Sequence, residues 1–238
     1  AGEHAVADGS AELLEKNARS VKTGRTVEDV ADSKVRIKPK AKASKASGGA
    51  PRRKSAVVLD KVIVAGAKAG ALPGFVEPAL ASLVEAVPLG DRWVHEVKFD
   101  GYRLLARLDH GRVKLLTRSG LDWTTKFPSV RKALEVLPAV TAFIDGEVVV
   151  ESEHGVPDFA ALQADLSEGR SDRFRYYAFD LLHLDGMDLR AAPLLDRKAA
   201  LSRLLADAAD GVLQHSQHFT DRGDIMLKHA CRLGLEGI

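Results

Sequence analysis

Apolar and polar residues alternate with a period of two along several short stretches of the chain, a pattern typical of half-buried strands. Residues 103–108 and 112–117 alternate in this way on either side of residues 109–111, which predicts a β-hairpin. The runs 143–150 and 176–182 are mostly apolar or aromatic and predict two further strands. The larger part of the chain is therefore expected to contain several strands, some of them joined as hairpins.

Three segments show the spacing of amphipathic helices. We expect one helix over 127–137, ended by a proline, and a second over 196–205 with its leucines on the apolar side. A third covers 221–233 and ends at Gly234, and a short strand is expected at 235–238. Because helices and hairpins are mixed along the chain, the pattern predicts an α+β fold rather than a doubly wound sheet.

Charge is distributed unevenly along the 238 residues. Nine Lys or Arg residues and no acid lie between Lys34 and Lys54, whereas residues 61–238 hold 22 basic and 25 acidic residues, a net charge of −3. We interpret residues 1–55 as a flexible basic tail or linker, with one short amphipathic segment at 11–18, and residues 56–238 as one folded domain. The tail is either a solubilising tether or a non-specific contact with DNA phosphates.

Other features narrow the class of protein. Cys231 is the single cysteine and is expected to pack inside the last helix, so no internal disulfide is possible and a reducing cytoplasm is predicted. No run approaches the ~18 apolar residues of a membrane span, and no signal peptide is visible. The histidines lack metal-ligand spacing, and the stretch 215–218 is expected to be a polar strand or loop. No Gly-x-x-x-x-Gly-Lys loop is present.

The candidate chemistry centres on Lys98, which ends an expected strand that starts at Trp93 and is followed by Asp100 and Arg103. Period-two alternation places Glu96 and Lys98 on the same face of that strand. An unperturbed amine has a pKa of about 10.4, so a nucleophilic lysine needs desolvation or nearby positive charge. Lys98 is therefore either a nucleophile or a surface lysine beside an Asp-Gly turn, and Arg103 would offer a fixed fork to a phosphate or ribose.

Two acids and one aromatic residue add to this hypothesis. Asp145 and Glu147 face the same way in an otherwise apolar strand, and paired acids in such a setting usually hold a cation or a ribose. Phe179 lies in the run 176–182 and could present a flat ring to a purine, although such runs are more often ordinary core. The combination favours a nucleotide site.

Four motifs carry a resemblance to a known superfamily, the covalent nucleotidyltransferases: residues 98–103, 145–147, 177–180 and 236–238 resemble its motifs I, III, IIIa and the start of IV. This superfamily contains ATP-dependent DNA ligases, RNA ligases and mRNA capping enzymes. The amino-acid sequences of three further segments are most similar to the ligase module of bacterial non-homologous end-joining ligases: residues 117–120, 159–163 and 179–186. The resemblance covers residues 71–238.

The resemblance implies a role for each matching residue. Lys98 matches the lysine that attacks the α-phosphate of ATP and becomes linked to AMP, and Glu96 resembles the acceptor of a hydrogen bond from the adenine amino group. Arg103 matches a ribose-side arginine, and Phe179 matches the ring stacked on adenine. Arg118 resembles the arginine that holds the AMP phosphate or the 5′-phosphate of a nick.

The remaining matches concern acids. Glu147 matches a ribose-binding and metal-associated glutamate, and Glu236 matches the motif IV glutamate that helps to place Mg²⁺ or Mn²⁺. Asp100 and Asp145 also match motif positions and could mainly orient their loops.

The resemblance further implies a nucleotidyltransferase (ATP-grasp-like) adenylation domain of antiparallel sheets flanked by helices. Its expected cofactors are ATP and Mg²⁺ or Mn²⁺, and its expected partner is nicked or broken DNA. End-joining factors or linked polymerase and phosphoesterase modules are possible further partners, in a bacterial, nucleoid-associated setting. Motif V and the OB-fold of the family do not occur here, so a truncated domain is expected. The alternatives are an RNA ligase, a capping-type guanylyltransferase, or an inactive nucleotide-binding or DNA-binding remnant.

Overall fold

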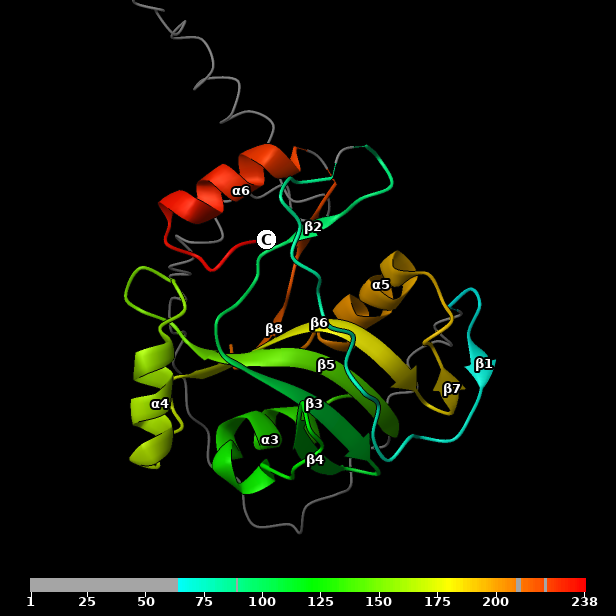
Figure 1. Cartoon of the computed structure of the whole chain (residues 1–238). Coiled ribbons are helices and arrows are strands. Elements are labelled where there is room, and N and C mark those ends of the chain that lie inside the picture. Colours follow the sequence, from blue (N-terminus) through cyan, green and yellow to red (C-terminus); the bar gives the residue numbers. More distant parts are fainter. Residues whose placement is uncertain (1–63, 89, 209–210, 221) are drawn as a thin grey trace, which may run out of the picture.

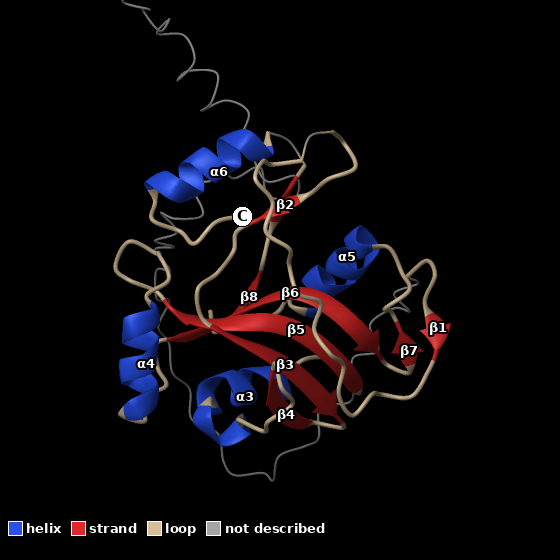
Figure 2. Ribbon diagram, viewed as in Figure 1, coloured by secondary structure: helices blue, strands red, loops and turns tan. Residues whose placement is uncertain are grey.

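The computed structural model describes residues 64–88, 90–208, 211–220 and 222–238 (Figure 1). The interpretation of residues 1–55 as a basic tail, and of 11–18 as an amphipathic segment, concerns residues outside these ranges. The described part consists of a large sheet with helices packed on it, and a small second layer near the C-terminal end of the chain (Figures 1 and 2). The α+β class expected from the sequence is confirmed.

The large sheet has seven strands among the described residues, in the order β1-β7-β6-β5-β3-β4, with β8 paired to β6. The β6–β8 pair is parallel, and the other pairs are antiparallel. The strands are β1 (Lys68–Ala69), β3 (Tyr102–Asp109), β4 (Arg112–Thr117), β5 (Thr141–Val150), β6 (Phe174–Leu184), β7 (Met187–Asp188) and β8 (Leu213–His215). The three long strands β3, β5 and β6 are neighbours and form the floor of a large cavity.

The hairpin predicted around residues 109–111 is confirmed as β3–β4. Asp109 pairs with Arg112, so the loop consists of two residues, and both His110 and Gly111 have positive φ angles, 50° and 77°. This is the backbone of a type I′ turn, whose twist matches that of the flanking strands. The turn fixes the register of β3 and β4, and thereby places the end of β4 beside the start of β3.

The three predicted helices are present as α3 (Pro128–Glu135), α5 (Leu194–Leu204) and α6 (Gly223–Arg232). A helix that the hydrophobic pattern did not predict, α4 (Phe159–Ser167), begins at Asp158, whose carboxylate accepts from the backbone N–H of Ala161 at 2.9 Å. A short 3₁₀ turn, η1 (Thr124–Lys126), precedes α3.

Helix α6 ends as expected at Gly234, which has a φ angle of 73°. The backbone N–H groups of Gly234 and Leu235 donate to the carbonyls of Cys231 and Ala230, the two bonds of a Schellman cap. The expectation that Cys231 packs inside this helix is wrong, because its side chain is exposed. The buried face of α6 is formed instead by residues such as Ile225, Met226 and Ala230.

The main core lies between one face of the large sheet and the helices. Alternate residues of β3, such as Leu104 and Ala106, are buried together with α3 and α5 residues such as Val130 and Leu201. Tyr176 of β6 is fully buried in the same core, and its hydroxyl donates to the carbonyls of Leu104 and Ile144 at 2.9 and 3.2 Å. The opposite face of the three long strands is left for the cavity, with a smaller apolar cluster at one end.

The second layer is formed by the pair β2 (His95–Glu96) and β9 (His218–Phe219), helix α6 and the last residues of the chain (Figure 1). Its apolar cluster is small: Phe219 and Met226 are buried, and Val97, Leu233 and Ile238 pack against them. The C-terminal segment reaches the nucleophile candidate, since the N–H of Lys98 donates to the carbonyl of Gly237 at 2.9 Å.

The strand expected from Trp93 to Lys98 is therefore shorter than predicted, and residues 97–101 interrupt the path to the next strand. Only His95–Glu96 and the residues from Tyr102 onward are strands, and Lys98 makes one isolated bridge to Gly237. The strand expected at 235–238 is reduced to that same bridge. The interruption has a physical reason: residues 97–101 leave the small sheet to enter the large one, and at Gly101 an added Cβ would lie 2.1 Å from the carbonyl oxygen of Val148.

Candidate active site

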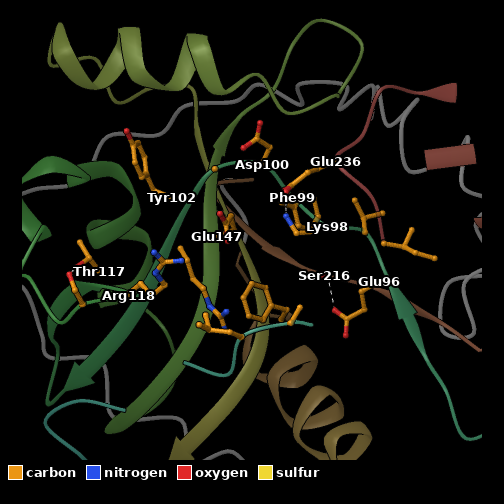
Figure 3. Close-up of a pocket in the computed structure, with 18 of the residues that line it drawn as sticks. Glu96, Lys98, Phe99, Asp100, Tyr102, Thr117, Arg118, Glu147, Ser216 and Glu236 are labelled. Atoms are coloured by element: carbon orange, nitrogen blue, oxygen red, sulfur yellow. Dashed lines mark hydrogen bonds and ion pairs between the residues drawn. The ribbon is translucent and has the colours of Figure 1, made fainter. Parts of the chain in front are cut away.

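A cavity of about 1040 Å³ lies between the large sheet and the second layer. All seven residues that the sequence identified as site residues line it: Glu96, Lys98, Arg103, Arg118, Glu147, Phe179 and Glu236. They come from β2, the 97–101 segment, β3, the end of β4, β5, β6 and the C-terminal segment (Figure 3). Residues spread over more than half of the sequence thus converge on one space.

The side chain of Lys98 points into the cavity next to two carboxylates (Figure 3). Its Nζ contacts the Oε1 atom of Glu236 as an ion pair, and both side chains keep substantial exposure, 49% and 40%. Burial raises the pKa of the neighbouring Glu147, and the positive charge of Lys98 acts to lower it. The amine is therefore held between acids while remaining open to a ligand.

Arg103 is held rigidly on the cavity wall. Its Nε and Nη2 donate to the two carboxylate oxygens of Asp145 at 3.0 and 2.7 Å, and its Nη1 donates to the carbonyl of Ala79 at 2.7 Å. Burial raises the pKa of Asp145, and the bonds from Arg103 oppose that rise. Asp145 is thus a partner of Arg103 rather than a cavity-lining acid, which agrees with the expectation that it mainly orients its surroundings.

Phe179 reaches the cavity from the face of β6 opposite the buried residues Tyr176 and Ala178, and it lies at a β-bulge. Along β5, Gly146 pairs with Ala178 and Asp145 pairs with Asp180, so Phe179 is the extra residue of β6 and has no partner in β5. Bulges of this kind are frequent beside functional sites. The Phe179 ring lines the cavity. The guanidinium carbon of Arg103 lies over this ring, 5.3 Å from its centre.

Glu147 lies opposite Arg103 in the β3–β5 register, on the cavity face of the sheet. Burial raises the pKa of its carboxyl to about 7, although Arg103 and Lys98 both act to lower it. A carboxyl that titrates near neutrality within a cavity is a feature of functional sites, where a group must change its protonation or bind a cation.

Glu96 is the acid of the small sheet that faces the cavity, and the structure gives it partners that the sequence did not reveal. Lys198 of α5 donates to its Oε2 at 2.8 Å, and the hydroxyl of Ser216 donates to the same oxygen at 3.1 Å. Burial raises the pKa of Glu96, and Lys198 opposes the rise most strongly. Ser216 lies in the 215–218 stretch, between the strands β8 and β9.

The segment after Lys98 is supported by aromatic stacking. The ring of Phe99 stacks on that of Tyr177 with centroids 4.1 Å apart, and the Tyr177 hydroxyl donates to Glu151. Asp100 also lines the cavity, at the turn that leads into β3 (Figure 3). These contacts fix the turn on which the Lys98 backbone depends.

Arg118 follows β4 in a tight turn, where the N–H of Gly120 donates to the carbonyl of Thr117 at 2.8 Å. Thr117, Arg118 and Ser119 all line the cavity, on the side formed by the β3–β4 hairpin (Figure 3). A guanidinium at this position can bind a phosphate by a bidentate hydrogen bond.

The residues fit a divalent cation only with help from a ligand. Among the described residues, no three His, Cys, Asp or Glu side chains are grouped to hold a metal ion. Glu147 and Glu236, the predicted metal residues, both line the cavity beside Lys98. Mg²⁺ is commonly bound by one or two carboxylates together with substrate phosphates and water, and this donor set suits that mode.

Known proteins with similar sequences indicate the family to which this chain belongs. The family model of the ATP dependent DNA ligase domain matches residues 78–238, and the chain belongs to that family. Among curated relatives, the multifunctional non-homologous end joining protein LigD of Pseudomonas aeruginosa is 44% identical over 167 residues, 70% of this chain. The corresponding LigD of Mycobacterium tuberculosis is 43% identical over 113 residues, 48% of this chain.

A solved structure extends the match to the fold. The ligase domain of M. tuberculosis LigD aligns with a TM-score of 0.51 and 38% identity, covering 60% of this chain and 46% of that one. The expected antiparallel sheet with flanking helices, of the kind found in that ligase domain, is confirmed. The chain spans about a fifth of the length of the Pseudomonas relative, 20%, and 14% of the mycobacterial one. No helix in the described ranges is both long enough and apolar enough to cross a membrane.

Proposed function

We propose that this chain is the adenylating domain of an ATP-dependent DNA ligase of the bacterial end-joining type. The observation that carries the proposal is the convergence of Lys98 with an adenine-side acid, a stacking ring, a fixed arginine and two further carboxylates in one cavity. Membership of the ligase domain family supports it. A related protein, mycobacterial DNA ligase D, has been solved in complex with ATP, and this supports ATP as the nucleotide.

In the first step, the neutral amine of Lys98 attacks the α-phosphorus of ATP. A P–N bond forms, the bond from the α-phosphorus to the bridging oxygen breaks, pyrophosphate leaves with the electron pair, and the proton lost by the nitrogen passes to solvent. Glu236 contacts the Nζ atom of Lys98 and is placed to hold the amine in line for this displacement. A divalent cation, held by Glu147 and Glu236 with the phosphates, would neutralise charge on the phosphate oxygens.

The remaining residues bind the nucleotide. Phe179 stacks on the adenine, and Glu96 accepts a hydrogen bond from the adenine amino group. Arg103, immobilised by Asp145, offers the ribose side a donor that has little conformational freedom left to lose. Stacking on Tyr177 holds Phe99, and with it the lysine segment, in place.

The later steps are part of the same proposal. AMP would pass from Lys98 to the 5′-phosphate of a DNA break, and attack by the 3′-hydroxyl would then release AMP and seal the strand. Arg118 lies on the hairpin side of the cavity, where it can hold the phosphate that receives or carries AMP. The relatives named as multifunctional end joining proteins support a setting in bacterial DNA repair, beside linked polymerase and phosphoesterase modules or separate end-joining factors.

Covalent labelling tests the first step. The chain is incubated with Mg²⁺ and ATP labelled at the α-phosphate, then separated on a denaturing gel. We expect a labelled band for the wild type and none for Lys98→Ala. Lys114→Ala serves as the control, because Lys114 is a lysine of β4 with an exposed side chain. ATP labelled at the γ-phosphate should give no band.

Several results would contradict the proposal. Label that persists in Lys98→Ala would place the nucleophile elsewhere, and label from the γ-phosphate would indicate phosphorylation. A wild-type chain that takes no label would exclude adenylation by this chain. Better labelling by GTP than by ATP would favour a capping-type guanylyltransferase. Transfer of the label to a nicked DNA duplex, rather than to RNA, separates a DNA ligase from an RNA ligase.

A further inference from the structure

Lys198 is a buried lysine next to the site that neither the motifs nor the family match singles out. It lies in α5 with a relative exposure of 1%. Its Nζ donates to the Oε2 of Glu96 at 2.8 Å, to the backbone carbonyl of Phe179 at 3.2 Å and to that of Ser216 at 3.0 Å. An ammonium group has three N–H donors, and all three are used.

The position of Lys198 would ordinarily take an apolar residue. It lies three residues before Leu201 and six before Leu204, two buried leucines on the stripe of α5 that packs against the sheet. Burying an ammonium group is costly unless it is paired and hydrogen-bonded, and a leucine or methionine would fill the same space. A packing role alone therefore does not explain a lysine here.

The three contacts join both residues proposed to bind adenine. Both hydrogen bonds that the described residues make to the Glu96 carboxylate end on Oε2, so Oε1 is the oxygen available to a ligand in the cavity that Glu96 lines. The Phe179 carbonyl lies in the bulge of β6, in the same residue whose ring lines the cavity. One ammonium group thus fixes the acid and the bulge at once.

We propose that Lys198 is a positioning residue that sets the choice of base: it holds Glu96 ionised and oriented, so that the cavity accepts adenine and rejects guanine. The inference rests on the proposed function and concerns the same site. An ionised carboxylate is only an acceptor, which suits the N6 amino group of adenine and repels the O6 oxygen of guanine. A protonated carboxyl can instead donate to O6.

The charges around Glu96 decide which form is present. Burial raises the pKa of Glu96, and the charge of Asp180 adds to that rise, whereas Lys198 and Ser216 oppose it and favour the ionised form. Asp180 is itself paired with Arg197, through bonds of 2.8 and 2.9 Å. His218 pairs with Glu96 across β2–β9, and burial together with Lys198 lowers the pKa of His218, which favours its neutral form. Lys198 is therefore the cation that directly opposes protonation of Glu96.

Lys198→Met tests the proposal, because methionine keeps an unbranched chain of similar volume and loses the charge. Labelling of Lys98 is measured with ATP and with GTP as a function of concentration, between pH 6 and 8.5. We expect the ratio of kcat/KM for ATP to that for GTP to fall by about tenfold or more, mainly through KM, as expected for one hydrogen bond to a charged group. Labelling by GTP should increase as the pH falls.

Two further variants separate charge from orientation. Ser216→Ala removes the other hydrogen bond to Oε2 without removing a charge, so it should raise the KM for ATP without a pH-dependent gain of GTP. Glu96→Gln carries a donor at every pH, so it should admit GTP independently of pH. The pair Glu96→Gln with Lys198→Met removes both charges together and leaves no unpaired buried ion, which keeps the test valid if Lys198→Met alone does not fold.

The double variant should show the same base ratio as Glu96→Gln alone. An ATP to GTP ratio in Lys198→Met equal to that of the wild type, at every pH, would overturn the inference. The same holds if Lys198→Met still changes the base ratio when Glu96 is already Gln. Either result leaves the proposed function standing, provided that the wild type takes label on Lys98. A wild type without label refutes the proposed function itself.

Discussion

Replacement of Glu147 by Gln should stabilise the domain at alkaline pH while it abolishes chemistry. Burial raises the pKa of Glu147 from 4.5 to about 7, so ionisation of this group opposes folding. This difference of about 2.5 in pKa corresponds to about 3.4 kcal/mol at most. Glu147 is only partly buried, and solvent screening reduces this to about 2 kcal/mol.

The sign of the pH dependence follows from proton binding. The folded-state pKa lies above the unfolded value, so between pH 4.5 and about 7 the folded chain holds a proton that the unfolded chain has lost. The stability associated with Glu147 is thus complete below about pH 4.5 and is lost as the pH rises through about 7. Glutamine resembles the protonated acid at all pH values. The gain in free energy of unfolding of Glu147→Gln over the wild type should therefore be largest at pH 8 and absent at pH 4.5.

Urea unfolding followed by tryptophan fluorescence measures this directly at pH 8, 6.5 and 4.5. Glu147→Gln should be about 2 kcal/mol more stable than the wild type at pH 8 and equal to it at pH 4.5. Glu153→Gln, which changes an exposed acid just after β5, should stay within about 0.5 kcal/mol at every pH. A variant that is less stable at pH 8, or equally stabilised at pH 4.5, would refute the reasoning. The Glu147→Gln variant should also lose the labelling of Lys98, although its stability at pH 8 increases.

Two further outcomes are expected. Phe179→Ala should weaken ATP binding by about 1 to 3 kcal/mol, the range for aromatic–base stacking, and calorimetric titration would check it; an unchanged affinity would place the base elsewhere. Deletion of residues 1–55 should leave Lys98 labelling nearly intact but weaken duplex binding and flatten the dependence of log affinity on log salt, because nine basic residues lie between Lys34 and Lys54. Unchanged affinity and slope would show that the tail is only a spacer.

Local patterns in the sequence were sufficient for the elements that depend on local interactions. The β3–β4 hairpin, three of the helices and the cap at Gly234 follow from alternation, helical spacing and turn residues. Motif resemblance likewise selected residues that line one cavity. Their individual roles remain predictions.

The missed features depend on tertiary contacts. The β-bulge at Phe179 comes from a one-residue shift in pairing with β5, and no pattern within β6 alone reveals that shift. Lys198 looks like a surface lysine, although its place on the apolar stripe of α5 was a usable sign. The expected strand through Lys98 was too long, because alternation does not show where a chain passes from one sheet to another.

The bridge between Lys98 and the C-terminal segment has a consequence for how activity is lost. Lys98 and its partner Glu236 are 138 residues apart in the sequence, and they meet through a layer whose apolar cluster is far smaller than the main core. Regions with few buried contacts open at lower free energy than the whole domain does. Opening of α6 with the large sheet still folded would release Gly237 and displace the amine, so the chemistry should fail at a lower temperature or urea concentration than the fold.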